Sequence, residues 1–134
     1  MEDSFFTKII RGDIPCHKVY EDDVVIAFLD IHPQVEGHTL VVPKVQVDHL
    51  WDLDDTTYAH LWRVAKHLAL NMRAQGLRAR TSAVVAGYGV PHAHIHLIPI
   101  ADENELKQPQ DTTTEPNHTA LAAMAQRLSI KEEI

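Results

Sequence analysis

The most regular alternation of hydrophobic and polar residues lies between residues 89 and 99. Three histidines stand there at every second position (His92, His94 and His96), and small or aliphatic residues fill the positions between them. Strict alternation of this length is typical of a half-buried β-strand, in which side chains two residues apart point to the same side. We therefore expect a strand within this stretch that carries all three imidazoles on one face and turns its aliphatic residues into the core.

Four further segments are rich in β-branched and aliphatic residues and are bounded by turn residues, as strands are. They cover residues 17–20, 24–31, 38–42 and 80–86. The acidic turn between the first two lets them pair as a hairpin. In the second segment Phe28 and Asp30 share a face. An acid after an aromatic residue suits a ligand with a flat ring and hydroxyl groups, but an aspartate that caps the turn at the strand end would give the same pattern.

Apolar residues at helical spacing predict a short helix over residues 5–10 and a C-terminal helix over about 117–130. The segment before the last helix, residues 101–116, is polar and rich in turn residues. We expect it to be a mobile loop. Its last three residues, 114–116, resemble a helix start. A loop beside a site often helps to cover it.

The longest predicted helix runs from about residue 54 to residue 75. An aspartate at its start can cap the first amides, and Gly76 suits the left-handed position just after the end. Its apolar residues form one stripe, which is typical of a helix that packs on a core. We expect the two histidines on its flanks to be solvated, namely His60 and His67.

These elements predict an α+β fold in a single domain that spans residues 1–134. About five strands joined mostly by short turns favour an antiparallel sheet with the long helix packed on one face. The opposite face would carry Asp30 and the row of histidines, and the C-terminal helix would complete the domain.

Composition narrows the classes of protein to which the chain can belong. The formal charge is −7 and no run of lysine or arginine stands out, so we do not expect nucleic acid as a partner, because nucleic-acid binders normally show a basic stripe. The single cysteine provides neither an internal disulfide nor a cysteine-based metal cluster. There is no signal-peptide core and no apolar run long enough for a membrane. We expect a cytoplasmic protein that does not associate with membranes.

The spacing of the histidines alone leaves three interpretations open. Histidines two apart on a strand can share a catalytic zinc ion, although no carboxylate or cysteine is interleaved with them. A neutral imidazole is also a good nucleophile towards phosphorus, and it is mostly neutral near pH 7. The third interpretation is a polar strand face exposed to water.

Motifs outside the histidine row extend the pattern. The row itself reads His-Ala-His-Ile-His-Leu-Ile at residues 92–98, and further motifs stand in order at residues 8–15, 19–22, 27–31 and 37–44. Together they resemble the histidine triad family of nucleotide hydrolases and transferases, in its Hint-like bacterial branch. The resemblance covers roughly residues 4 to 100 and favours phosphorus chemistry over the metal interpretation.

The resemblance implies a reaction and a set of roles. His94 would attack the α-phosphorus of a nucleotide and form a nucleotidyl-histidine, which water then hydrolyses. His96 would bind a phosphoryl oxygen, while His92 and His38 would hold the nucleophile in its working tautomer. Asp30 would accept hydrogen bonds from the ribose hydroxyls.

The resemblance also implies where the rest of the nucleotide would bind. The base would lie in an apolar slot formed by Phe5, Phe6, Ile9, Phe28 and Ile31. Backbone amides would face the phosphate in the turn formed by Gly87, Tyr88, Gly89 and Val90, because glycine permits a close approach.

The implied substrate is a purine nucleoside phosphoramidate, an adenylylated amine or a diadenosine polyphosphate, and the implied assembly is a homodimer. The reaction requires no metal, although Mg²⁺ can arrive with a polyphosphate. The alternative is a nucleotide-binding module with weak or vestigial turnover. It is motivated by departures from the family pattern on the leaving-group side, at Thr81, Tyr88 and Gly89.

Another departure concerns zinc. Zinc-bearing bacterial members of the family use a Cys-x-x-Cys near the start and a histidine two residues after the Pro-Lys pair, together with one histidine of the triad strand. The corresponding positions here are Ser4, Thr7 and Gln46. We therefore expect no structural zinc, and we do not expect the nearby His49 to substitute.

Overall fold

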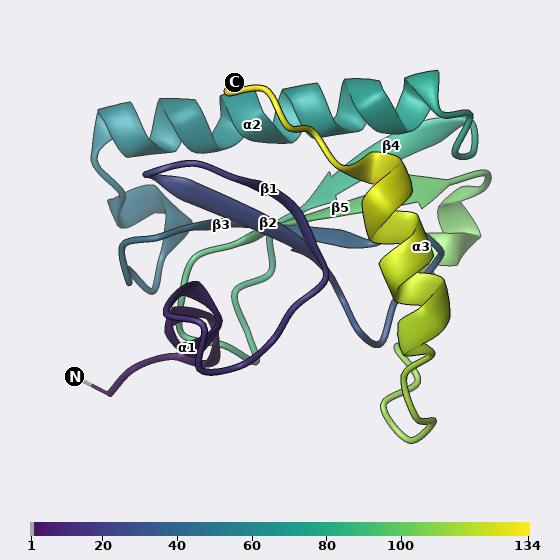
Figure 1. The fold of residues 1–134 in the computed structure, drawn as a ribbon, viewed down its shortest axis with the longest axis horizontal. Coiled ribbons are helices and arrows are strands. Elements are labelled where there is room, and N and C mark those ends of the chain that lie inside the picture. Colours follow the sequence, from purple (N-terminus) through teal and green to yellow (C-terminus); the bar gives the residue numbers. More distant parts are fainter. Residues whose placement is uncertain (1) are drawn as a thin grey trace.

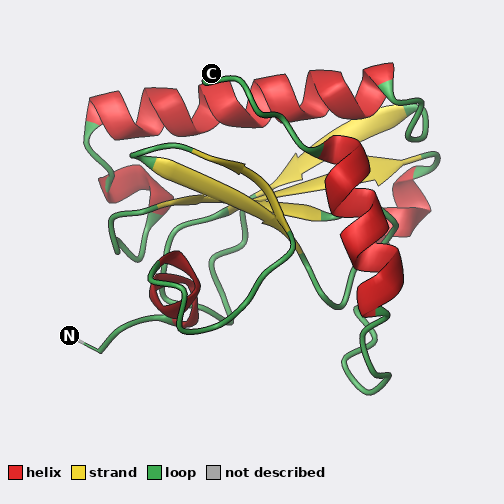
Figure 2. Cartoon of the chain, in the orientation of Figure 1, coloured by secondary structure: helices red, strands yellow, loops and turns green. Residues whose placement is uncertain are grey.

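A five-stranded antiparallel sheet forms the centre of the fold, in the order β1-β2-β3-β5-β4. The computed structural model describes residues 2–134. Its strands are β1 (Lys18–Glu21), β2 (Val25–Leu29), β3 (Thr39–Pro43), β4 (Arg80–Val84) and β5 (Ile95–Ile100). Figures 1 and 2 show helices on both sides of this sheet. The predicted α+β fold with an antiparallel sheet is therefore confirmed.

The long helix α2 (Asp55–Ala74) covers one face of the sheet (Figure 1). Its first turn is capped by Asp54, whose side chain accepts from the amide of Thr57. One stripe of the helix is buried against aliphatic residues of the sheet and against α3 (His118–Leu128), and its members are Leu61, Val64, Ala65, Leu68 and Met72. None of the helices formed by residues 2–134 is long and apolar enough to cross a membrane.

The short helix α1 (Phe5–Ile10) lies on the side of the sheet opposite α2 (Figure 1). Ser4 caps it, because the serine side chain accepts from the amide of Thr7. Phe6 and Ile9 are buried in a second, smaller apolar cluster with four residues of the sheet, which are Ile26, Phe28, Leu40 and Val42. The alternation in β2 thus divides this strand between two cores, as the period of a strand requires.

The histidine segment differs from the prediction in where its strand begins. The regular strand β5 starts at Ile95, so that His96 lies in it while His92 and His94 precede it. The predicted strand was therefore too long at its start. The amide of Ala93 donates to the carbonyl of Val47 at 2.7 Å instead of joining a strand ladder. The side chains nevertheless alternate between the two faces, since Ala93 and Ile95 enter the α2 core while Phe6 of α1 packs against His92 and His94.

One other expectation is wrong. His60 is not solvated: its Nε2 lies 2.6 Å from Oδ2 of Asp22 and the side chain is half-buried. Burial opposes ionisation of Asp22, but the hydrogen bond with His60 and those from neighbouring groups hold its pKa at about 2. The last helix begins at His118 with Asn117 as its cap, which agrees with the helix expected over about 117–130.

The segment predicted as a mobile loop contains a short 3₁₀ helix at Glu103–Lys107. The side chain of Gln34 donates to carbonyls of this segment, including that of Leu106 at 2.8 Å and that of Gln108 at 2.7 Å. The segment is therefore attached by hydrogen bonds to the loop that precedes β3.

Candidate active site

The side chain of His94 is buried and has a defined tautomer. Its Nδ1 lies 2.7 Å from the carbonyl oxygen of His92. A carbonyl only accepts hydrogen bonds, so Nδ1 carries the proton and Nε2 of the neutral ring keeps its lone pair. Burial lowers the pKa of His94, while the carbonyl of His92 and the charge of Asp30 oppose this effect. The ring is therefore neutral at pH 7, and it presents a nucleophilic Nε2.

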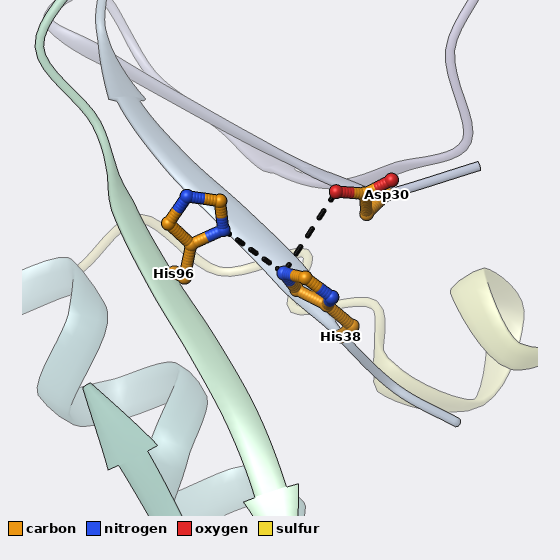
Figure 3. Close-up of side chains that lie close together, drawn as sticks. All are labelled: Asp30, His38 and His96. Atoms are coloured by element: carbon orange, nitrogen blue, oxygen red, sulfur yellow. Dashed lines mark hydrogen bonds and ion pairs between the residues drawn. The ribbon is translucent and has the colours of Figure 1, made fainter. Parts of the chain in front are cut away.

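The tautomer of His96 is fixed by a separate chain of hydrogen bonds. The amide of Gln34 donates to Nδ1 of His38 at 3.1 Å, which leaves the proton of His38 on Nε2. That Nε2 lies 2.9 Å from Nδ1 of His96 and donates to it (Figure 3). His96 must then carry its own proton on Nε2. Burial, followed by the neighbouring rings of His94 and His38, lowers the pKa of His96 to about 4, so this ring is also neutral.

The two rings that end these chains lie side by side. The centroids of His94 and His96 are 4.9 Å apart, with their planes at 70°. One ring offers a lone pair at Nε2 and the other offers an N–H at Nε2. A nucleophile next to a hydrogen-bond donor is the arrangement required for attack on a centre whose oxygens gain negative charge.

Asp30 lies at the end of β2, close to His38. Its Oδ1 accepts from the amide of His32 at 2.9 Å, and its Oδ2 accepts from Nε2 of Gln110 at 2.9 Å. Oδ2 also lies 3.8 Å from Nε2 of His38 (Figure 3). One oxygen thus caps a turn, as one interpretation of the sequence held. The other faces the histidines and is shared with a side chain of the 101–116 segment.

Among residues 2–134, one group of side chains has the composition of a metal site. Asp30, His38 and His96 each provide a ligand atom, and these atoms lie within 4.8 Å of one another. Two imidazoles and a carboxylate suit several transition metals. The two ring nitrogens that would face the ion, however, are already bonded to each other, since Nε2 of His38 donates to Nδ1 of His96.

The apolar part of the site is built around Phe6 of α1. Its ring meets those of Phe28, His92 and His94 edge-on, with centroids 5.6, 5.8 and 5.0 Å away. Ile9 belongs to the same apolar cluster, and Val90 packs against it. The structure therefore places three of the five residues expected to hold the base, namely Phe6, Ile9 and Phe28, beside the histidine row.

Other expected residues lie at the edge of this group. Phe5 is 49% exposed and touches Phe6. Ile31 is 38% exposed and lines a cavity of about 240 Å³ on the α3 side of its loop. Gly87 and Gly89 have φ of +82° and +97°, which a residue with a side chain adopts only with strain. Tyr88 between them is 92% exposed.

His92 has a different environment from the other two histidines of its row. It is fully buried, with Nε2 2.7 Å from the carbonyl oxygen of Pro43 and Nδ1 2.7 Å from Oγ of Ser4. Both ring nitrogens are therefore occupied by the protein, and His92 is a supporting residue. The pattern of the sequence did not identify its partner Ser4 as part of the site, although a serine before a helical stripe is an N-cap signal.

The positions at which the resemblance would place zinc ligands do not suit that metal here. Structural zinc sites use thiolates and imidazoles, whereas Ser4, Thr7 and Gln46 provide hydroxyl and amide groups. These groups are bonded to one another and to Nδ1 of His92. The imidazole of His92 is the one available as a ligand at this place, and a metal ion would have to displace Ser4 from its Nδ1.

Comparison with known proteins agrees with the fold and shows the family. The HIT domain family model matches residues 11–103. An uncharacterised HIT-like protein of Borreliella burgdorferi is 42% identical over 106 residues, which cover 74% of this chain and 76% of that protein. A protein of Saccharomyces cerevisiae named adenosine 5'-monophosphoramidase HNT1 is 38% identical over 99 residues, covering 73% of this chain and 63% of that protein.

Solved structures show the same likeness. A Hit-like protein from Bartonella henselae superimposes with a TM-score of 0.78 at 31% identity, covering 94% of both chains. A Zn-bound histidine triad family protein from Mycobacterium smegmatis superimposes with a TM-score of 0.72 at 30% identity, covering 92% of this chain and 93% of that one. The family model and the sequence identity both reach well over half of the chain, which therefore belongs to the HIT family and is related to its hydrolases.

Proposed function

We propose that the chain is a nucleotide hydrolase that acts at the α-phosphorus of a purine nucleoside phosphoramidate, an adenylylated amine or a diadenosine polyphosphate. The observation that supports it best is the pair formed by His94 and His96. Two independent chains of hydrogen bonds leave a lone pair on Nε2 of the first ring and a proton on Nε2 of the second. The relatives named as adenosine 5'-monophosphoramidases support the phosphoramidate within this set.

The proposed reaction on a phosphoramidate has two steps. Nε2 of His94 forms a bond to phosphorus, the bond from phosphorus to the leaving nitrogen breaks, and the amine departs with a proton from solvent. Positive charge then develops on the ring, and the carbonyl of His92 2.7 Å from Nδ1 stabilises it. Water adds to phosphorus as the bond to His94 breaks, and one proton returns to solvent. His96 donates to a phosphoryl oxygen in both steps.

Turnover of a fluorogenic adenosine phosphoramidate by the purified chain tests this proposal. We expect the His94→Ala variant to be inactive and a His67→Ala variant to be fully active, because His67 is exposed on α2. Turnover that survives in His94→Ala would remove this residue from its role.

A nucleotide-binding module with weak turnover is a second candidate. The leaving-group side favours it, because Thr81, Tyr88 and Gly89 depart from the family pattern there and the side chain of Tyr88 is 92% exposed. A native chain that binds adenosine monophosphate but releases no product from any of the three substrate classes would support the module. Rapid turnover with any of them would exclude it.

The reaction as proposed needs no metal, although a polyphosphate substrate can bring Mg²⁺. The group formed by Asp30, His38 and His96 makes the opposite case testable. Activity that a chelator abolishes and zinc restores would replace the covalent mechanism with a metal-dependent one.

We also propose a homodimer in the cytoplasm. Strand β4 lies at one edge of the sheet, where its outer side can pair with a second chain. Light scattering after size exclusion gives the mass in solution, and a monomer at micromolar concentration would refute the dimer. Fractionation of cells that produce the chain tests its location.

A further inference from the structure

We propose that Ser4, held in place by Gln46, is a positioning residue for His92 and, through it, for the nucleophile His94. The three residues come from three separate segments of the chain, which meet at the start of α1. The inference rests on the function proposed above and adds to it a support for the nucleophile that is built without metal.

The orientation of Gln46 is set by its two ends. Its Nε2 donates to the carbonyl of Glu2 at 2.8 Å, so its Oε1 must face the other way. That oxygen accepts from the amide of Ser4 at 2.9 Å and from Oγ1 of Thr7 at 2.7 Å. The side chain of Gln46 therefore ties the first residues of α1 to the segment that follows β3.

The hydroxyl of Ser4 has two acceptors within reach for its proton, Oγ1 of Thr7 at 3.2 Å and Nδ1 of His92 at 2.7 Å, and the contact with His92 is the shorter. Its oxygen already accepts from the amide of Thr7 at 3.0 Å, and the proton of the Thr7 hydroxyl is given to Gln46. The imidazole of His92 needs a donor, because its Nε2–H is given to the carbonyl of Pro43 and its Nδ1 must accept if the ring is neutral. Ser4 Oγ is 2.7 Å from that Nδ1 and is buried with it.

His92 transmits this anchoring to the nucleophile. With both ring nitrogens fixed, the residue cannot turn without breaking a buried hydrogen bond. Its own carbonyl accepts from Nδ1 of His94, and this bond keeps the lone pair of His94 on Nε2. Phe6 on the same short helix also packs edge-on against both rings. The position of α1 and the tautomer of His94 are thus set together.

The chemistry of these donors explains why the cluster does not suit zinc. It has hydroxyl and amide groups in place of thiolates, and each group already has a partner. The zinc-bound relative from Mycobacterium smegmatis shares the fold over most of the chain. In the present protein an uncharged network of hydrogen bonds links α1 to the histidine segment.

The test compares Ser4→Ala with Ser4→Thr, which keeps the hydroxyl. Nitrogen-15 NMR of the histidine rings reports the hydrogen bond at Nδ1 of His92 and the tautomer of His94 without any substrate. In Ser4→Ala we expect the His92 Nδ1 resonance to move to that of an unbonded nitrogen and a second tautomer of His94 to appear. We expect kcat to fall roughly tenfold with KM little changed, since a buried acceptor left unpaired costs about as much as one hydrogen bond.

Three controls keep the outcome clear. Asp54→Ala removes the cap of α2, and we expect it to lower stability without moving either histidine resonance. If Ser4→Ala does not fold, Gln46→Met and Gln46→Glu replace it, because only glutamate keeps the acceptor for Ser4 and Thr7. Lack of turnover in the native chain would refute the proposed function, and the NMR comparison would still decide the inference.

Histidine resonances and kcat that are the same in Ser4→Ala and Ser4→Thr would overturn the proposal. The same holds if the alanine variant loses only thermal stability, since the role of Ser4 would then be that of a helix cap alone.

Discussion

The two faces of the sheet are held by different forces. On the α2 face, aliphatic side chains of the helix pack on those of the strands. On the α1 face, a smaller apolar cluster shares the space with four of the five buried polar side chains among residues 2–134, which are Ser4, His38, His92 and His94. Hydrophobic packing has no direction, whereas a hydrogen bond also decides which atom carries the proton. Changes on the first face should therefore alter stability, and changes on the second should alter the reaction.

The largest expected effect is that of His94→Ala on turnover. We expect kcat to fall by at least about a thousandfold, because the covalent route requires the nucleophile. The unfolding temperature should change by only a few degrees, since α2 and its core remain intact. Steady-state kinetics and thermal unfolding of one preparation give both values. If His94→Ala lost much stability but kept full activity per folded molecule, the α1 face would govern stability and not the reaction, contrary to this comparison.

Leu68→Ala should show the opposite behaviour. Leu68 is buried on the inner side of α2, and a cavity in a core costs about 2–5 kcal/mol of unfolding free energy. Activity per folded molecule should stay near that of the native chain. Leu70→Ala is the matched control, because Leu70 is exposed on the same helix and should change stability by less than about 0.5 kcal/mol. Equal losses in the two variants would show that α2 does not pack as described.

Asp30→Ala should weaken nucleotide binding by roughly tenfold to a hundredfold, because hydrogen bonds to a carboxylate are strong. The effect on kcat should be smaller, since the ribose is held equally before and during the reaction. Isothermal titration with adenosine monophosphate and steady-state kinetics separate the two effects. Asp23→Ala changes an exposed aspartate and is the control. Unchanged affinity with lost turnover would place Asp30 in the chemistry instead.

Stability should fall as the pH is lowered from about 6.5 towards 4. Burial lowers the pKa of His96 to about 4 in the folded chain, while the unfolded chain takes up this proton near 6.5. The unfolded state therefore binds more protons within this window, and stability rises with pH. Denaturant unfolding at several pH values should give a shallower slope for His96→Asn than for the native chain. Equal slopes would mean that His96 is solvated when folded.

The smallest expected effect is that of Gln110→Ala. Gln110 is exposed and donates to Oδ2 of Asp30, for which the ribose would compete. Removing it should raise nucleotide affinity by about threefold, the value of one modest hydrogen bond. Gln126→Ala on the exposed side of α3 is the control. A loss of affinity in Gln110→Ala alone would show that this side chain assists binding.

The fold could be predicted largely from local patterns. Periods of two and of about 3.6 residues identified the strands and helices, and the alternation around His94 correctly placed aliphatic residues in the α2 core. The start of β5 was missed because the chain before Ile95 bonds to Val47 and Pro43 instead of to a regular ladder. Such contacts depend on residues more than forty positions away.

Contacts between residues far apart in the sequence also explain which parts of the site were missed. Ser4 and His92 are 88 positions apart, and Gln110 and Asp30 are 80 apart. His60 was expected in solvent because the pattern of its own helix does not reveal a contact with Asp22, which lies 38 positions earlier. The histidines could be identified because three of one kind stand in a regular row, whereas single serines and glutamines acquire their roles only through the fold.

The most direct test of the covalent mechanism is mass spectrometry of the chain after rapid quenching with an adenosine phosphoramidate. We expect a nucleotidyl adduct on His94, absent from His94→Ala and stable enough under mild base to be located by peptide mapping. An adduct on another residue, or turnover with no adduct at the earliest quench times under conditions that preserve phosphohistidine, would contradict it.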